Sequence, residues 1–170
     1  MLQYHIGTSL LDTKCQYICH QVNCQGKMNS GVAKAIREKW PEIYHDYLDW
    51  ITVWEDIACD EYGSLECGPI ASDLMLGHIL TVAVNGEQSV INMAAQQYYG
   101  YDGRRYTSYD AFWLCLGEIK NTIPAGSSIA FPCYIGCGLG GADWKVISTM
   151  IDVALGKDYD IHIYKLEETK

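Results

Sequence analysis

The chain has 170 residues, of which 49% are hydrophobic, and it carries a formal net charge of −9 at pH 7. This length and apolar content can build one substantial core, so we expect residues 1–170 to form a single domain. The acidic balance argues against a nucleic-acid partner, because nonspecific affinity for nucleic acid comes from Lys and Arg side chains that neutralise phosphates. A small phosphate ester stays compatible, since backbone amides can bind it.

The cysteines and the first residues indicate the compartment. The eight cysteines follow no paired Cys-x-x-Cys spacing and lie mostly within apolar runs, so we expect reduced, buried thiols and no metal site. The opening MLQYHIGTSLLD has neither the basic start nor the apolar core of a signal peptide, and no run is long enough to span a membrane. We therefore expect a cytoplasmic protein without a membrane partner.

The first half of the chain reads as two strands followed by two helices. Residues 2–6 and 16–22 have strand character, and residues 31–40 have the apolar spacing of a helix that ends before Pro41. A second helix is expected over residues 42–51. Residues 56–69 show no clear pattern and are expected to contain a surface loop.

The second half begins with a hairpin signal. Two strand-like runs flank Asn85-Gly86 in LGHILTVAVNGEQSVINMAA, which predicts a tight turn and antiparallel pairing. A helix over 109–121, a strand over 127–131, a helix over 143–155 and a strand over 159–164 follow. Strands that alternate with helices, together with one hairpin, predict an α/β fold: a three-layer α/β/α sandwich with a mixed sheet.

The stretch FPCYIGCGLGGADW, residues 131–144, carries the strongest functional signal. Its glycines allow positive φ angles, which bring backbone N–H groups close to an anion. Asp143 is placed to cap the following helix, whose positive dipole end points back at the loop. The pattern therefore predicts a cradle for a phosphorylated ligand.

A second polar loop follows the strand at residues 16–22. In ICHQVNCQGKMNSGVAKAI, Ser30 opens a helix, Asn23 and Asn29 offer amides suited to sugar hydroxyls, and His20 is a titratable group on the strand. Ligands of such sheets sit outside the carboxyl ends of the parallel strands. The two loops side by side would hold a diphosphate and a ribose.

Simpler interpretations compete with each of these assignments. A histidine on an apolar strand is often only a core residue, and the role of Asp143 can be helix capping alone. Arg104 and Arg105 can be a solvated pair. A Rossmann dinucleotide site ranks low, because only one helix and one strand follow the glycine turn.

Three segments together carry a family resemblance. HQVNCQGKMNSGVAKAIREKWP, NMAAQQYYGYDGRRYTSYDAF and FPCYIGCGLGGADWKVISTMI resemble the macrodomain family in order and spacing. Within it, the chain is most similar to the small stand-alone ADP-ribose 1''-phosphate phosphatases and related ADP-ribosyl hydrolases. The resemblance covers nearly the whole chain.

The resemblance implies a function and a set of site residues. It implies binding of ADP-ribose or a derivative and hydrolysis of the phosphomonoester of ADP-ribose 1''-phosphate, with no cofactor and no metal. His20 corresponds to the histidine implicated in catalysis, as base, acid or nucleophile, and Asp143, with Asp102 second, is its expected carboxylate partner. The implied ligand-binding residues are Thr8, Ser9, Asn23, Lys27, Met28, Asn29, Ser30, Gly31, Val32, Gln96, Ile135, Gly136, Cys137, Gly138, Leu139, Gly140, Gly141 and Tyr164.

The sequence also departs from the family pattern at three places. Most macrodomains have an aspartate for the adenine amine after the first-strand glycine, where this chain has Gly7-Thr8-Ser9. Glycohydrolases of the family use a lysine after the hairpin strand and an aspartate after GCGL, where this chain has Gln96-Gln97 and Gly140. That chemistry is therefore ranked below the phosphatase. A module that binds ADP-ribose without turnover and an O-acetyl-ADP-ribose hydrolase are the alternatives; the oligomeric state is left open.

Overall fold

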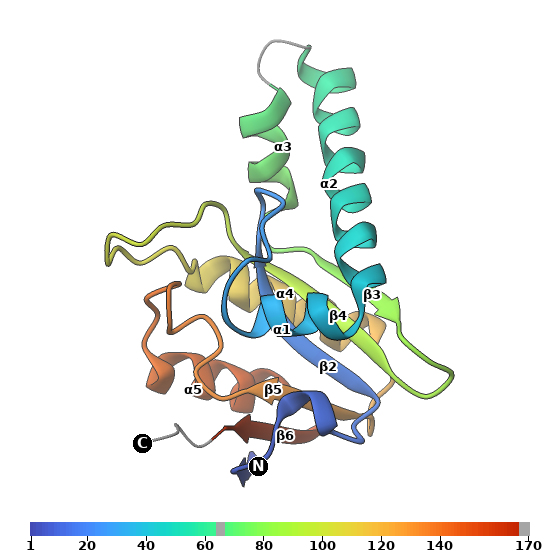
Figure 1. Cartoon of the computed structure of the whole chain (residues 1–170), viewed down its shortest axis with the longest axis vertical. Helices are drawn as coiled ribbons and strands as arrows, with labels where there is room; N and C mark the ends of the chain where they lie inside the picture. Colours follow the sequence, from blue (N-terminus) through green and yellow to red (C-terminus); the bar gives the residue numbers. More distant parts are fainter. Residues whose placement is uncertain (64–66, 167–170) are drawn as a thin grey trace.

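The computed structural model describes residues 1–63 and 67–166 and contains one six-stranded sheet with helices on both faces (Figure 1). The strand order is β1-β6-β5-β2-β4-β3, and β3 alone runs antiparallel to its neighbour. The strands are β1 (Gln3–Ile6), β2 (Tyr17–Asn23), β3 (Ile79–Ala83), β4 (Ser89–Gln96), β5 (Ser128–Pro132) and β6 (Asp160–Lys165). The helices are η1 (Leu10–Asp12), α1 (Gly31–Lys39), α2 (Pro41–Tyr62), α3 (Cys67–Met75), α4 (Tyr109–Thr122) and α5 (Trp144–Leu155).

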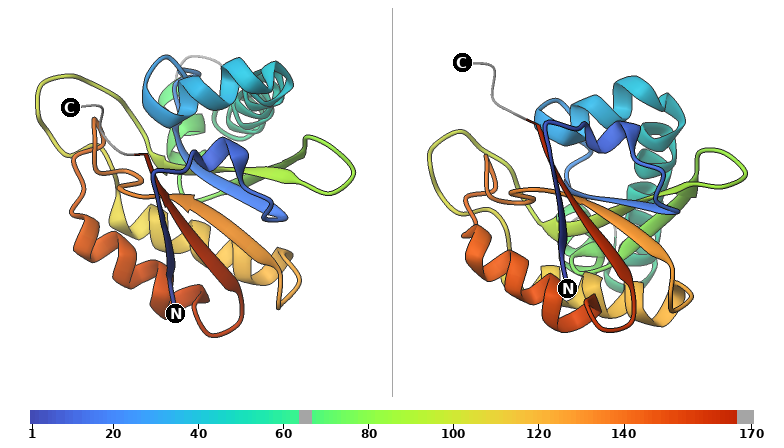
Figure 2. Two further views of the ribbon diagram at one scale, coloured as in Figure 1. Left: turned by 60° about the horizontal axis from the view of Figure 1, so that its bottom comes forward. Right: turned by 90° about the horizontal axis from the view of Figure 1, so that it is seen from below.

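The sheet separates two hydrophobic cores, so the expected three-layer sandwich with a mixed sheet is confirmed (Figure 2). Successive residues of β5 alternate between the layers: Ile129 and Phe131 pack with α4 and α5, whereas Ala130 packs with α1 and α2. This is the period of two that a strand covered on both faces requires. Helix α5 contributes three buried side chains to its layer, among them Ile147.

The turn at Asn85-Gly86 joins β3 and β4 as predicted. The Asn85 side-chain oxygen accepts hydrogen bonds from the amides of Glu87 and Gln88, both at 2.8 Å, which closes the turn. β3 and β4 then pair antiparallel from Ile79 opposite Met93 to Ala83 opposite Ser89. The hairpin thus adds the antiparallel edge to an otherwise parallel sheet.

Most of residues 56–69, a stretch expected to contain a surface loop, is helical. α2 continues to Tyr62 and α3 begins at Cys67; positions 64–66 lie outside the described residues. The two helices project together from the sheet (Figure 1). α3 packs along the second half of α2, where Ala58 is buried, so tertiary contact stabilises helix that the local pattern did not reveal.

The expectation of eight reduced thiols is also wrong at two positions. Cys59 of α2 and Cys67 of α3 form a disulfide, with their Cα atoms 5.0 Å apart. Of the free cysteines, four are buried, whereas Cys133 and Cys137 are only half-buried. Sequence spacing could not reveal the pair, because the packing of α3 on α2 brings the two residues together.

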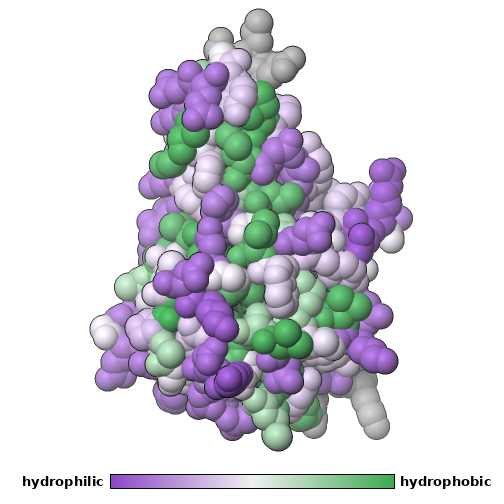
Figure 3. All heavy atoms as spheres, turned by 180° about the vertical axis from the view of Figure 1, so that it is seen from behind, coloured by the Kyte–Doolittle hydropathy of each residue, from purple (hydrophilic) through white to green (hydrophobic). Residues whose placement is uncertain are grey.

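The projecting helix pair carries apolar surface. Seen from behind, apolar side chains gather along these helices (Figure 3), and α2 exposes Val53 and Ile57. No helix within residues 1–63 and 67–166 combines the length and apolar character needed to cross a membrane.

Candidate functional site

The site lies at the ends of two neighbouring parallel strands, β2 and β5, whose onward connections lead to opposite sides of the sheet. β2 and β5 pair at Tyr17 and Ile18, and the next parallel strands, β4 and β6, lie on opposite sides of them. Connections that diverge in this way leave a crevice at the carboxyl ends of the strands. The loop before α1 and the loop before α5 border this crevice, as the sequence predicted.

The loop after β5 presents free backbone amides. Its bend relies on positive φ angles at Gly136 (72°) and Gly141 (69°). Throughout the described part of the chain, no hydrogen-bond acceptor meets the amides of Gly136, Gly138, Leu139 and Gly140. Amides left unpaired by the fold are donors that an anion can use.

The start of α1 presents a second set of amides. Ser30 is the N-cap residue, but its side chain makes no capping hydrogen bond. The amides of Gly31, Val32 and Ala33 likewise have no acceptor among the described residues. A helix of nine residues with an uncapped first turn directs both its donors and its dipole at an anion.

Three adjoining cavities follow the crevice, and we name them by position. The central cavity, about 360 Å³, is bordered by both sets of amides, by His20 and by Gln21. The outer cavity, about 260 Å³, shares Val32 and residues 132–134 with it and extends to Ser9 and Tyr164. The inner cavity, about 120 Å³, shares Gln21, Ser30, Ala33, Gln96 and Leu139 with the central cavity.

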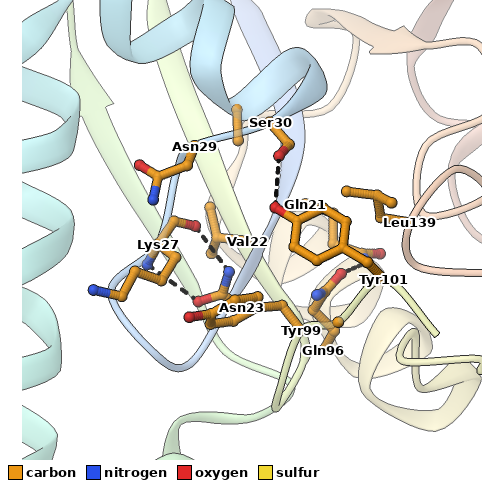
Figure 4. A pocket seen from close by; sticks show the side chains of 12 residues that line it. Gln21, Val22, Asn23, Lys27, Asn29, Ser30, Gln96, Tyr99, Tyr101 and Leu139 are labelled. Carbon is orange, nitrogen blue, oxygen red and sulfur yellow. Dashed lines mark hydrogen bonds between the residues drawn. The ribbon is translucent and has the colours of Figure 1, made fainter.

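The inner cavity is rich in donors (Figure 4). Its lining includes the exposed Lys27, Asn29, Tyr99 and Tyr101, and the Tyr101 hydroxyl lies 3.3 Å from the Ser30 hydroxyl across the opening. None of the described residues that line it is acidic. In a chain of net charge −9, this favours a negatively charged group.

The Asn23 side chain has a structural role in the loop. Its oxygen accepts hydrogen bonds from the Gln25 amide (2.9 Å) and the Tyr47 hydroxyl (2.9 Å), and its nitrogen donates to the Lys27 carbonyl (2.8 Å). Asn23 therefore shapes the wall of the inner cavity that it also lines. Met28 is fully buried in the core beside it, so its side chain faces away from solvent.

His20 is a buried, neutral imidazole beneath the central cavity. Only 1% of the residue is exposed, and its Nε2–H donates to the Asn92 side-chain oxygen at 2.6 Å. Burial lowers the pKa of His20 to about 4, because the charged form loses its water; the hydrogen bond to Asn92 opposes this shift. Its Nδ1 is buried without a partner among the described residues. In the neutral imidazole this nitrogen carries a lone pair that can accept a proton.

The two candidate carboxylates serve other purposes. Asp143 caps α5 by accepting from the Lys145 amide at 2.7 Å. Asp102 accepts from the Arg104 amide at 3.1 Å and from the Tyr106 hydroxyl, and it pairs with the Arg104 guanidinium; these hydrogen bonds, that of the amide first, lower the pKa of Asp102. Neither residue lines any of the three cavities.

The remaining candidates divide between the cavities and their surroundings. Ser9 and Tyr164 border the outer cavity, and the Tyr164 ring stacks on His5 at 4.6 Å. Thr8 is exposed outside the three linings. Within the glycine loop, Ile135, Gly136, Gly138, Leu139 and Gly140 line the central cavity, whereas Cys137 and Gly141 do not.

Sequence reasoning missed several lining residues. Gln21 spans the central and inner cavities, and its amide nitrogen donates to Gln96 at 2.7 Å. Tyr99 and Tyr101 come from the loop after β4. In the sequence, these two tyrosines flank Gly100 in the run YYGY, outside any apolar pattern. That run was the feature from which this wall of the inner cavity could have been predicted.

Solved structures match this chain over nearly its whole length. A protein of unknown function from Bacteroides thetaiotaomicron superposes with a TM-score of 0.75 at 26% identity and covers 98% of both chains. A macrodomain protein from Streptomyces coelicolor gives 0.71 at 21% identity and covers 97% of this chain and 99% of its own. A DarTG protein of Thermosipho africanus, solved in complex with ADP-ribose, gives 0.70 at 18% identity and covers 99% of this chain and 43% of its own.

These matches define the class of fold. The chain has the macrodomain fold, and its crevice lies at the carboxyl ends of the parallel strands. No family model matches the sequence, and no curated protein sequence matches it.

Proposed function

We propose that this chain is a macrodomain that binds ADP-ribose or an ADP-ribose derivative. The observation that carries the proposal is the convergence of two sets of unpaired amides, residues 136 and 138–140 and residues 31–33, on one central cavity. A diphosphate carries negative charge on both phosphates and suits such a double set of donors. The ADP-ribose complex of the Thermosipho protein, which shares the fold, supports the same ligand.

The three cavities suit the three parts of such a ligand. The outer cavity, with Tyr164 and Leu10, has the aromatic and apolar lining that an adenine needs. The central cavity would hold the diphosphate. The inner cavity, with Ser30 and Asn29, would take the distal ribose, whose hydroxyls can both donate and accept.

We further propose that the reaction is hydrolysis of the phosphomonoester of ADP-ribose 1''-phosphate. Lys27 belongs to the described lining of the inner cavity, and none of the described lining residues is acidic, which favours a phosphate on the distal ribose. His20 borders the central cavity, which adjoins the inner one, and it is neutral at physiological pH because its pKa is about 4. Its Nδ1 would accept a proton from a water molecule, or attack phosphorus, where a phosphate on the distal ribose reaches the central cavity. Phosphoryl transfer relies mainly on such positioning and charge neutralisation.

A second candidate is a module that binds ADP-ribose without turnover. It is favoured by the burial of His20, whose imidazole has the neutral Asn92 as its only hydrogen-bond partner among the described residues, and by the capping role of Asp143. Binding alone needs the amides and not the imidazole.

Calorimetry and a turnover assay on the same preparation test both candidates. We expect saturable binding of ADP-ribose, phosphate release from ADP-ribose 1''-phosphate, and loss of that release in His20→Ala. Binding without phosphate release would identify the non-catalytic module, whereas release of acetate from O-acetyl-ADP-ribose or of ADP-ribose from a modified protein would identify the other hydrolases. Absence of binding would overturn the assignment.

A further inference from the structure

We propose that Thr107 is a positioning residue that holds the glycine loop in its anion-binding shape; this rests on the proposed function, because it concerns the loop assigned to the diphosphate. Thr107 lies just before α4, far from the loop in sequence. Only 2% of it is exposed, and it lines none of the three cavities. Its action must therefore pass through the residues it contacts.

Thr107 contacts both ends of the segment that carries the free amides. Its hydroxyl donates to the Gly136 carbonyl at 2.8 Å. Its backbone amide donates to the Gly140 carbonyl at 2.9 Å, and the neighbouring Tyr106 amide donates to the same oxygen at 2.9 Å. The unpaired amides of Gly138 and Leu139 lie between these two fixed points.

Residues of the sheet in turn hold Thr107 in place. The Gln21 side-chain nitrogen donates to the Thr107 hydroxyl at 2.8 Å and to Gln96 at 2.7 Å, and Thr107 forms an isolated bridge with Gln96 at the end of β4. The hydroxyl thus donates its single proton to the glycine loop and accepts one hydrogen bond from the sheet side. The chain of contacts runs from β2 and β4 through Thr107 to the glycine loop.

The space around Thr107 shows how closely the two segments approach. A Cβ added at Gly140 would collide with the Thr107 hydroxyl and with the Gly136 carbonyl. At Gly136 an added Cβ would lie 3.0 Å from the Thr107 hydroxyl and 2.7 Å from the Gln21 side-chain oxygen. The glycines at 136 and 140 are therefore needed for contact with Thr107 as well as for approach to an anion.

The test compares Thr107→Val with Thr107→Ser. Valine keeps the shape and removes the hydroxyl, whereas serine keeps the hydroxyl. In the valine variant the Gly136 carbonyl still accepts a hydrogen bond from the Ala142 amide, and the Gln21 side chain still donates to Gln96. We therefore expect the variant to fold. We expect ADP-ribose affinity to fall about tenfold in Thr107→Val, which corresponds to the loss of one or two buried hydrogen bonds, and to return to within about twofold of wild type in Thr107→Ser.

Hydrogen exchange of residues 133–142 in the free protein supplies a second measurement. We expect faster exchange there in Thr107→Val, with normal exchange in Thr107→Ser and in the control Thr149→Val. Among the described residues, the Thr149 hydroxyl bonds only to the Lys145 carbonyl within α5. Thr107→Ala serves if the valine variant does not fold. Unchanged affinity and exchange in the variant without the hydroxyl would overturn the proposal. If wild-type protein binds no ADP-ribose, the proposed function fails, and exchange alone decides the role of Thr107.

Discussion

His20 of β2 and Asn92 of β4 are register partners whose side chains meet at 2.6 Å inside the sheet. The Asn92 nitrogen donates to the Leu80 carbonyl at 3.4 Å, which turns its oxygen toward the imidazole. An oxygen in that position selects the tautomer with the proton on Nε2 and leaves the lone pair on Nδ1. Asn92 thereby fixes the state in which His20 can act as a base.

The first prediction concerns stability and pH. The pKa of His20 is about 4 in the folded protein and near its ordinary 6.5 when unfolded, so between these values only the unfolded chain takes up the proton. The stability contribution is therefore full above pH 6.5 and is lost as the pH falls toward 4. We expect the difference in unfolding free energy between wild type and His20→Gln to shrink by about 2 kcal/mol from pH 7 to 4.5, measured by urea denaturation. A difference independent of pH would contradict a buried neutral His20.

The second prediction concerns the pH dependence of phosphate release. Asn92→Asp would place a carboxylate beside Nε2–H, and an opposite charge at that distance favours the protonated imidazole. We expect the midpoint of the acid limb in the pH profile of kcat/KM to move upward from near pH 4 by about one to two pH units. A histidine NMR titration of the same variant measures the shift directly. An unmoved limb with a raised pKa would remove His20 from the proton transfer.

Local patterns in the sequence were sufficient to predict the two loops, but not the contacts that residues distant in sequence make around them. The glycine turn, the Asn85-Gly86 hairpin and the Asp143 cap each lie within a few consecutive residues, so spacing alone predicts them. The pairing of His20 with Asn92 depends on which strands are neighbours, and the contact of Thr107 with Gly136 depends on where a distant loop packs. Both are set by tertiary structure, as is the second half of α2.

The third prediction separates ADP-ribose from its 1''-phosphate. Lys27 is an exposed cation on the inner cavity, where we propose the distal phosphate lies. Lys27→Met should weaken binding of ADP-ribose 1''-phosphate about fivefold at low salt while changing ADP-ribose binding less than about twofold, because only the former places charge beside residue 27. Lys34→Met is the matched control, since that side chain pairs with Glu38 on the surface of α1. Equal losses for the two ligands would place the phosphate elsewhere.

The fourth prediction concerns the Cys59–Cys67 disulfide. Alkylation of denatured, unreduced protein should modify the six free cysteines, and reduction beforehand should raise the number to eight. The bond closes a short loop, with a sequence separation of 8, which corresponds to about 2 kcal/mol of unfolding free energy through the entropy of the unfolded chain. We expect the double variant Cys59→Ser, Cys67→Ser to lose about that much in urea denaturation.

The same double variant should bind ADP-ribose with unchanged affinity. The disulfide joins α2 and α3 near their ends that lie farthest from the sheet (Figure 1). The proposed cavities lie at the carboxyl ends of β2 and β5. Neither cysteine lines the three cavities. Loss of stability together with retained affinity would show that the helix pair and the site are independent. A parallel loss of affinity would show that the projecting helices support the loop at residues 24–27, which Tyr47 of α2 holds through the Asn23 side chain and the Gly26 amide.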